Sequence, residues 1–183
     1  MFDLNTFWGV VGIIFFIIIF ILFLGSIWLK RGLAVLNKTH TPSEIILGEG
    51  EKTAIIIYQP TKHDTAYNIT MAIANVLKEN GYTVTINYPS DEINYNLSEY
   101  DLIIFGSGAY VGKSSPVLGN YILKNRFRNK KVLIYTVGRL IKDDSDLKEL
   151  KVLLDGVNDV KAIKVKKGQE EKIKRFVEKI IKD

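Results

Sequence analysis

Cysteine is absent from the 183 residues of this chain, and histidine occurs only twice. A chain without cysteine forms no disulfide and no thiolate metal site, and it fits a reducing compartment. The two histidines stand alone, without the partners of a Ser-His-Asp set, a zinc cluster or a paired-carboxylate site. The sequence therefore predicts neither a catalytic residue of these kinds nor a bound metal ion.

Charge is absent from residues 7–29, where most side chains are Ile, Phe, Leu or Val. At a rise of about 1.5 Å per residue, a helix over these positions would span roughly 35 Å, enough to cross a bilayer core of about 30 Å. Trp8 and Trp28 lie near its ends, where interfacial aromatic residues are found. No basic residue precedes the run and no small-residue cleavage site follows it, unlike a cleaved signal peptide. We interpret residues 1–29 as an uncleaved transmembrane anchor.

The charges that flank this apolar run predict its orientation. Lys30, Arg31 and Lys38 follow it, whereas only Asp3 and the terminal amine precede it. Basic flanks stay on the cytoplasmic side of a membrane. We therefore expect a single-pass protein of the cell membrane, with its N-terminus outside and its C-terminal domain in the cytoplasm.

The remainder of the chain is basic. All 25 Lys and Arg lie at or after Lys30, against 19 of the 20 acidic residues. Such an excess of positive charge is attracted to an anionic lipid leaflet, so the bilayer is an expected partner. No aromatic–basic motif or recognition helix accompanies the charge, and we expect no nucleic acid partner.

A strand–helix alternation begins after a region without periodicity. Residues 30–51 are expected to form a juxtamembrane linker, and residues 52–183 a single domain. Apolar runs predict strands at 53–58, 82–88, 101–105, 130–137 and 160–165, and amphipathic stretches predict helices at 65–80, 116–127, 143–155 and 169–182. This pattern indicates an α/β fold with a doubly wound, five-stranded parallel sheet of order 2-1-3-4-5.

The most informative stretch is residues 101–116, which read DLIIFGSGAYVGKSSP. Its strand stops at Gly106, a loop of small residues follows, and Ser115 and Pro116 begin a helix. In this topology the loops after the first, third and fourth strands meet at the switch point, where open α/β sheets bind ligands. These three loops are residues 59–64, 107–114 and 138–142.

Within this stretch, FGSGAYVGKSSP (105–116) resembles the flavodoxin loop that packs on the isoalloxazine ring of flavin mononucleotide (FMN). The family pattern is Gly-Ser-Pro-x-Tyr-x-Gly with a Ser/Pro helix start, and it is matched except that Gly108 replaces the proline. The resemblance implies a flavodoxin-like fold that binds FMN noncovalently. It also implies that the ring is lined by Ser107, Gly108, Ala109, Tyr110, Gly112 and Gly138.

The loop after the first strand departs from the flavodoxin pattern. Flavodoxins bind the FMN phosphate with a Ser/Thr-x-Thr-Gly-x-Thr turn, and residues 60–65 read PTKHDT instead. Pro60 has no N–H to donate, and His63 replaces a glycine that permits close backbone approach. The resemblance leaves Thr61, Lys62 and Thr65 as phosphate ligands, helped by the amino end of the following helix.

Two functions remain open at this point. The resemblance implies an FMN-dependent electron carrier or oxidoreductase at the cytoplasmic membrane face, whose partner is a redox protein or a quinone. A flavodoxin-like, quinone-coupled protoporphyrinogen oxidase is similar, although no residue here identifies that substrate. The alternative is a flavodoxin-fold interaction module that has lost flavin binding, for which Pro60 and His63 are the arguments.

Three other motifs are near misses. Residues 107–114 almost match the ATP-binding GxxxxGK[ST] loop, but Ser107 replaces its first glycine and the loop follows the third strand. A phosphoacceptor receiver would need clustered acids where Gln59 and Gly106 stand. His63 and Asp64 are adjacent in sequence, and adjacent residues seldom face each other as an acid–base pair.

Overall fold

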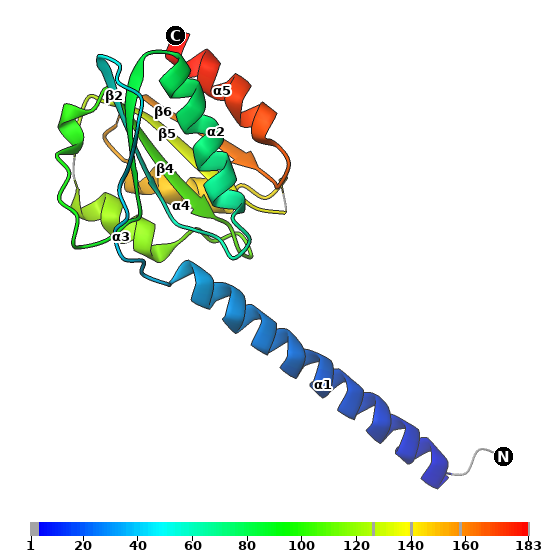
Figure 1. Cartoon of the computed structure of the whole chain (residues 1–183). Coiled ribbons are helices and arrows are strands. Elements are labelled where there is room, and N and C mark those ends of the chain that lie inside the picture. Colours follow the sequence, from blue (N-terminus) through cyan, green and yellow to red (C-terminus); the bar gives the residue numbers. More distant parts are fainter. Residues whose placement is uncertain (1–3, 126, 140, 158, 183) are drawn as a thin grey trace. The chain divides into compact units, whose positions relative to one another are not determined.

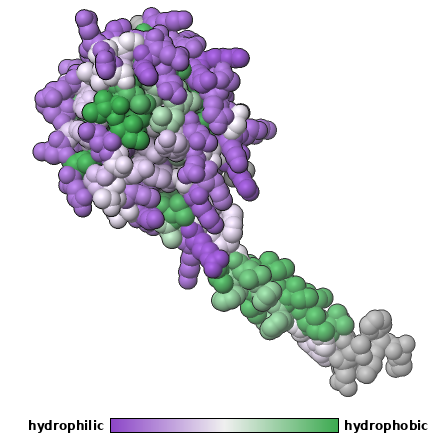
Figure 2. Space-filling view, in the orientation of Figure 1, coloured by the Kyte–Doolittle hydropathy of each residue, from purple (hydrophilic) through white to green (hydrophobic). Residues whose placement is uncertain are grey.

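The computed structural model describes residues 4–125, 127–139, 141–157 and 159–182. The chain divides into two compact units, Met1–Val35 and Leu36–Asp183. Most of the first unit belongs to helix α1 (Leu4–Leu36), whose apolar side chains are exposed from Trp8 to Leu24. Figure 2 shows this helix as an apolar surface along much of its length. By length and composition it is apolar enough to cross a membrane.

The second unit is built on one six-stranded sheet (Figure 1). Its strands are β1 (Ile45–Leu47), β2 (Lys52–Tyr58), β3 (Tyr82–Asn87), β4 (Leu102–Gly108), β5 (Lys131–Val137) and β6 (Asp159–Val165). They lie in the order β1-β3-β2-β4-β5-β6, and all neighbours pair in parallel except β1 with β3. The predicted order 2-1-3-4-5 is confirmed for the five parallel strands. The sixth strand, β1, was not predicted, because three residues are too few for a periodic pattern.

Helices cover both faces of the sheet. Helices α2 (Thr65–Glu79) and α5 (Glu170–Lys182) lie side by side on one face, and α3 (Pro116–Lys124) and α4 (Ser145–Leu153) cover the other (Figure 1). Each layer has its own apolar core, represented by Ile56 and Ile73 on the first face and by Ile57 and Leu118 on the second. A short 3-10 turn, Leu97–Glu99, stands in the connection between β3 and β4.

Strand β4 is longer than the sequence predicts. The expected strand ends at Phe105, but Gly106–Gly108 continue the parallel ladder opposite Tyr135–Val137 of β5. Gly106 is required here because a Cβ atom at this position would lie 2.1 Å from the ring of Tyr135. The Tyr135 hydroxyl in turn forms a 2.5 Å hydrogen bond with Thr70 of α2. A glycine that looks like a strand stop in the sequence is therefore a packing position inside the strand.

The folded unit begins at Leu36, so the expected linker of residues 30–51 is only in part a linker. Residues 36–44, called the strap below, are held by three polar side chains from three elements. Ser115 Oγ donates to the Leu36 carbonyl at 2.6 Å, and Gln59 Nε2 donates to the Lys38 carbonyl at 2.7 Å. Asn87 Oδ1 accepts from the Ser43 amide at 2.8 Å. The strap then leads directly into β1.

Candidate functional site

Three loops meet at the edge of the sheet where the parallel strands end, called the carboxyl edge below. They follow β2, β4 and β5, whose last residues share one register because Tyr58 pairs with Gly106 and Gly106 with Tyr135. A Cβ atom on Gly108 would lie 2.6 Å from the Thr61 side chain, and one on Gly138 would lie 3.0 Å from Ala109. The structure thus brings together the loops that the sequence assigns to one site.

The loop after β2, residues 59–65, uses one of its predicted phosphate ligands internally. Thr61 Oγ1 accepts a 3.1 Å hydrogen bond from the Ala66 amide and so caps α2. Helix geometry leaves the Thr65 and Tyr67 amides without intrahelical acceptors. The Lys62 side chain is exposed. Lys62 and the α2 amino end are therefore the groups that this loop offers to a phosphate.

The ring loop, as residues 107–114 are called below, starts with the last two residues of β4 and contains a tight two-residue turn. The backbones of Tyr110 and Lys113 exchange hydrogen bonds of 3.0 and 3.1 Å. Val111 and Gly112 between them have φ angles of 51° and 70°. Positive φ is rare for a β-branched residue such as Val111 and stores backbone strain. Such strain persists only where the surroundings hold the turn in place.

Helix α4 supplies those surroundings. The Ser145 hydroxyl shares its one proton between the Gly112 carbonyl, at 3.0 Å, and Asp143 Oδ1, at 2.5 Å. Glu149 Oε2 accepts from both the amide and the hydroxyl of Ser114, at 3.1 and 3.0 Å. Ser145 and Glu149 were missed in the sequence, because positions on an exposed helix face carry no signal for contacts 33 and 35 residues away.

A buried ion pair lies beneath the β5–α4 connection. Lys164 Nζ lies 2.6 Å from Asp146 Oδ1, and their side chains are 6% and 0% exposed. The same ammonium donates to the Asp143 carbonyl, and Lys164 Cε would lie 3.1 Å from a Cβ on Gly138. Hydrogen bonds from the Ser145 hydroxyl and amide hold the pKa of Asp143 below its usual value. Lys164 is one of two lysines in the strand 159–165, so the sequence carried only a weak signal for this pair.

A row of buried polar side chains crosses the carboxyl edge on the α3/α4 face. Gln59, Ser107 and Thr136 are all fully buried. Ser107 Oγ donates to the Gly108 carbonyl at 2.8 Å and accepts from the Ser115 amide at 2.9 Å. The Ser107 side chain is therefore engaged within the protein, where it holds the ring loop in place. Contact between a ligand and the Ser107 backbone stays a prediction. Within the described chain, Gln59 Oε1 and Thr136 Oγ1 have no hydrogen-bond partner.

The other predicted site residues lie in the upper part of the ring loop and its neighbour. Ala109 and Tyr110 are half-buried, and the Ala109 amide donates to the Val137 carbonyl at 2.7 Å. Gly138 is half-buried, and its amide donates to the Val165 carbonyl at 3.0 Å. These contacts fix the backbone of both loops, while contact with a flavin ring stays a prediction.

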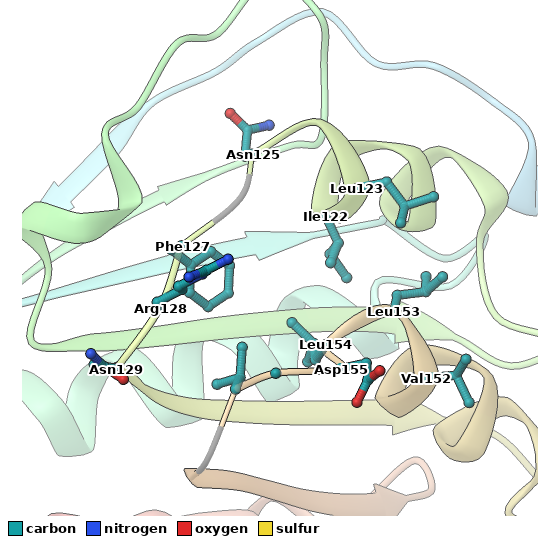
Figure 3. Close-up of a pocket in the computed structure, with 12 residues that line it drawn as sticks. Ile122, Leu123, Asn125, Phe127, Arg128, Asn129, Val152, Leu153, Leu154 and Asp155 are labelled. Carbon is teal, nitrogen blue, oxygen red and sulfur yellow. The ribbon is translucent and has the colours of Figure 1, made fainter.

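A cavity of about 830 Å³ lies elsewhere, at the ends of α3 and α4 (Figure 3). Figure 3 shows Phe127 and Arg128 on one side and Leu153 and Leu154 on the other. Phe127 and Arg128 lie in the connection that leads into β5, whereas Leu153 ends α4 and Leu154 begins the connection into β6, at the opposite edge of the sheet from the three loops. Among the described residues no His, Cys, Asp and Glu cluster could hold a metal ion.

Comparison with known proteins agrees with this architecture. A family model described as a flavodoxin domain matches residues 55–182. An uncharacterised protein of Methanocaldococcus jannaschii is 32% identical over 84 residues, which cover 45% of this chain and 52% of that protein. The chain thus matches about half the length of this relative.

Solved structures give the same fold. Oxidised flavodoxin 2 from Bacillus cereus has a TM-score of 0.59 at 19% identity, covering 71% of this chain and 98% of that one. A flavodoxin mutant of Fusobacterium nucleatum bound to FMN has a TM-score of 0.53 at 13% identity, covering 72% and 94%. These likenesses show the fold, and the match over residues 55–182 shows that the chain belongs to the flavodoxin domain family, whose fold serves FMN-type electron transfer.

Proposed function

We propose that this protein binds FMN noncovalently at the carboxyl edge and transfers electrons at the cytoplasmic face of the cell membrane. The observation that carries the proposal is the meeting of three loops, where Gly108 lies against Thr61 and Gly138 against Ala109. Glycines at these contacts let the three loops approach one another closely, which places the predicted phosphate and ring residues at one edge of the sheet. FMN would supply the redox chemistry, and the protein its binding and orientation.

The residues present fit the phosphate end of FMN. Lys62 provides a cation, and the amides of Thr65 and Tyr67 point from the amino end of α2, where the helix dipole favours an anion. Thr65 Oγ1 donates a long 3.3 Å bond to the His63 carbonyl, which is weak enough to exchange for a ligand oxygen.

The residues also fit the ring end. The turn of residues 110–113 is held from α4 through Ser145 and Glu149, so the ring loop needs little ordering on binding. Tyr110 in this turn presents an aromatic side chain suited to packing on a flat ring. Gly138, in the loop after β5, lines the remaining side of the proposed ring site.

The membrane setting follows from α1. Its apolar length suits a bilayer, and Lys30 and Arg31 favour a cytoplasmic folded unit. An electron carrier held there meets partners in or on the membrane, so we propose a membrane redox protein or a quinone as its partner. With either partner the protein acts as an FMN-dependent oxidoreductase.

One observation favours a second candidate, an interaction module without flavin. The Thr61 hydroxyl already caps α2, and Pro60 offers no amide to a phosphate. If the loss of phosphate contacts from Thr61 and Pro60 outweighs the phosphate contact of Lys62, FMN does not bind. The carboxyl edge is then a protein-binding surface on a flavodoxin fold.

The two candidates separate in an FMN titration of the full chain in detergent, followed by quenching of FMN fluorescence. The carrier predicts saturable binding below about 10 µM, weakened roughly tenfold by Lys62→Ala because a charge-assisted phosphate contact is lost. Lys78→Ala, at the far end of the same helix, is the matched control and leaves the affinity unchanged. Absence of binding at tens of micromolar FMN would reject the carrier.

A further inference from the structure

The strap joins the two sides of the crevice in which sheets of this kind bind ligands. That crevice lies between the strands at which the strand order reverses, here β2 and β4, because β2 has β3 on one side and β4 on the other. Ser115, directly after the ring loop, binds the Leu36 carbonyl. Gln59, directly after β2, binds the Lys38 carbonyl. A segment of the chain itself is therefore fastened to both sides of the crevice.

The Leu36 side chain fills space beside the ring loop. It is 4% exposed, and its Cδ2 atom would lie 3.7 Å from a Cβ atom on Gly108. The Thr61 side chain borders the same position, at 2.6 Å. Gly108 is a predicted ring residue and Thr61 a predicted phosphate ligand, so Leu36 stands where the two parts of the candidate site meet. A ligand that approaches Gly108 from this side has to displace a buried leucine.

The strap has little buried surface beyond Leu36. The side chains of Asn37, Lys38 and Thr39 are exposed, and His40 is half-buried against Tyr88. Segments with few buried contacts open at a lower free energy than the core of a protein. The strap is therefore suited to leave the crevice while the sheet stays folded.

Departure of the strap would free polar groups that it now engages. The Nε2 atom of Gln59 and the hydroxyl of Ser115 would lose the two strap carbonyls and become available to ligand oxygens. Gln59 is fully buried, and among the atoms that the structure describes its Oε1 has no hydrogen-bond partner. A buried acceptor without a partner costs free energy that a ligand hydroxyl would recover. These groups suit a hydroxyl-bearing ligand, and the ribityl chain of FMN is one.

We infer that the strap is an internal competitor of FMN, because Leu36 and the two bound carbonyls close the crevice between β2 and β4. Flavin binds when the strap leaves. A site that is open in only a fraction of the molecules binds its ligand with an affinity lowered by that fraction. Whatever holds or releases the strap then sets how much flavin the protein carries. This inference rests on the proposed binding of FMN.

The test compares FMN affinities of the full chain in detergent, measured by quenching of FMN fluorescence. Leu36→Ala removes most of the side chain that fills the crevice and should tighten binding about tenfold. Leu47→Ala, at a half-buried leucine of β1, is the matched control for general loosening and should leave the affinity unchanged. Thr39→Gly with Thr41→Gly, at exposed strap positions, should tighten binding about twofold, since glycine favours the released chain.

A second readout follows the strap itself. Trypsin cleaves after Lys38, and saturating FMN should speed this cleavage several-fold although a bound ligand stabilises the folded unit as a whole. If Leu36 were instead a fixed wall of the flavin site, Leu36→Ala would weaken binding and FMN would protect Lys38 from trypsin. Either of these results, or equal affinities of Leu36→Ala and the wild type, would overturn the inference. Failure of the flavin proposal looks different, because neither protein would then bind FMN at tens of micromolar, and the inference would fall with it.

Discussion

The Ser115 hydroxyl donates a 2.6 Å hydrogen bond to the carbonyl of Leu36, a residue 79 positions earlier in the chain. Both residues are buried. The same oxygen accepts from the Leu118 amide at 3.4 Å and so caps α3. One hydroxyl therefore joins the first residue of the folded unit to the helix that follows the ring loop.

Replacing Ser115 with alanine should destabilise the folded unit by about 1–3 kcal/mol, because a helix cap is lost and a buried carbonyl is left unpaired. Urea unfolding of the full chain in detergent, followed by near-ultraviolet circular dichroism of the tyrosines, measures the change. Ser98→Ala, at an exposed position, is the control and should stay within about 0.5 kcal/mol of the wild type. A cost for Ser115→Ala no larger than that of the control would show that the strap is not held at this point.

The Lys164–Asp146 pair should behave as a unit. Asp146→Ala leaves an ammonium buried without its carboxylate and should cost about 3–5 kcal/mol, whereas Lys164→Met combined with Asp146→Leu should recover most of that loss. The exposed pair of Lys161 and Asp159, at 3.6 Å, is the matched control, since breaking it should cost less than about 1 kcal/mol. Urea unfolding measures the free energy of unfolding of each variant. A double variant as destabilised as the sum of separate losses at Lys164 and Asp146 would contradict the prediction.

The strap should weaken on acidification through His40. Burial of its ring, with Lys38 nearby, lowers the pKa of His40 from the usual 6.5, and the ring packs 5.3 Å from that of Tyr88. Because the folded pKa is the lower one, the unfolded chain takes up the proton first, and this contribution to stability is lost as pH falls through 6.5.

The corresponding measurement compares melting temperatures of the wild type and His40→Gln between pH 8 and pH 5. The wild type should lose about 1–3 °C more than the variant over this range. Above pH 7.5 the difference between the two proteins should be constant, since only packing distinguishes them there. If the melting temperatures of the two proteins fall in parallel down to pH 5, His40 is excluded as the titrating group.

The parallel sheet could be predicted because its strands are buried on both faces and therefore read as continuous apolar runs. Residues 53–58 and 130–137 are examples, and their predicted ends differ from β2 and β5 by a single residue. Helix ends were less predictable. The helix expected over 116–127 ends at Lys124, because Phe127 leaves the helix to pack against Phe105 at 6.0 Å.

The strap and β1 could not be predicted. Their contacts are made by Gln59, Asn87 and Ser115 to backbone carbonyls and amides, and backbone groups leave no trace in a sequence. The polarity of Gln59 directly after an apolar strand was visible, but it also suits a solvated loop. Only the fold reveals that this side chain is buried.

The loops of the candidate site could be predicted from the sequence, but the residues that hold these loops in place could not. The ring loop carries a pattern of small residues and an aromatic, whereas Ser145 and Glu149 reach it from α4, and Lys164 of β6 holds the loop after β5. Their contacts depend on how α4 and β6 pack, and no spacing rule relates them to Gly112 or Ser114.

Strand β1 bears on how copies of this protein meet one another. A long bare edge of a sheet invites pairing between chains. Here β3 is covered by three residues of β1, and Gly48 with a φ of +83° turns the chain away directly afterwards. The other edge, β6, presents the charged side chains of Asp159 and Lys161. Both margins of the sheet are thereby blunted, which protects the protein from edge-to-edge aggregation.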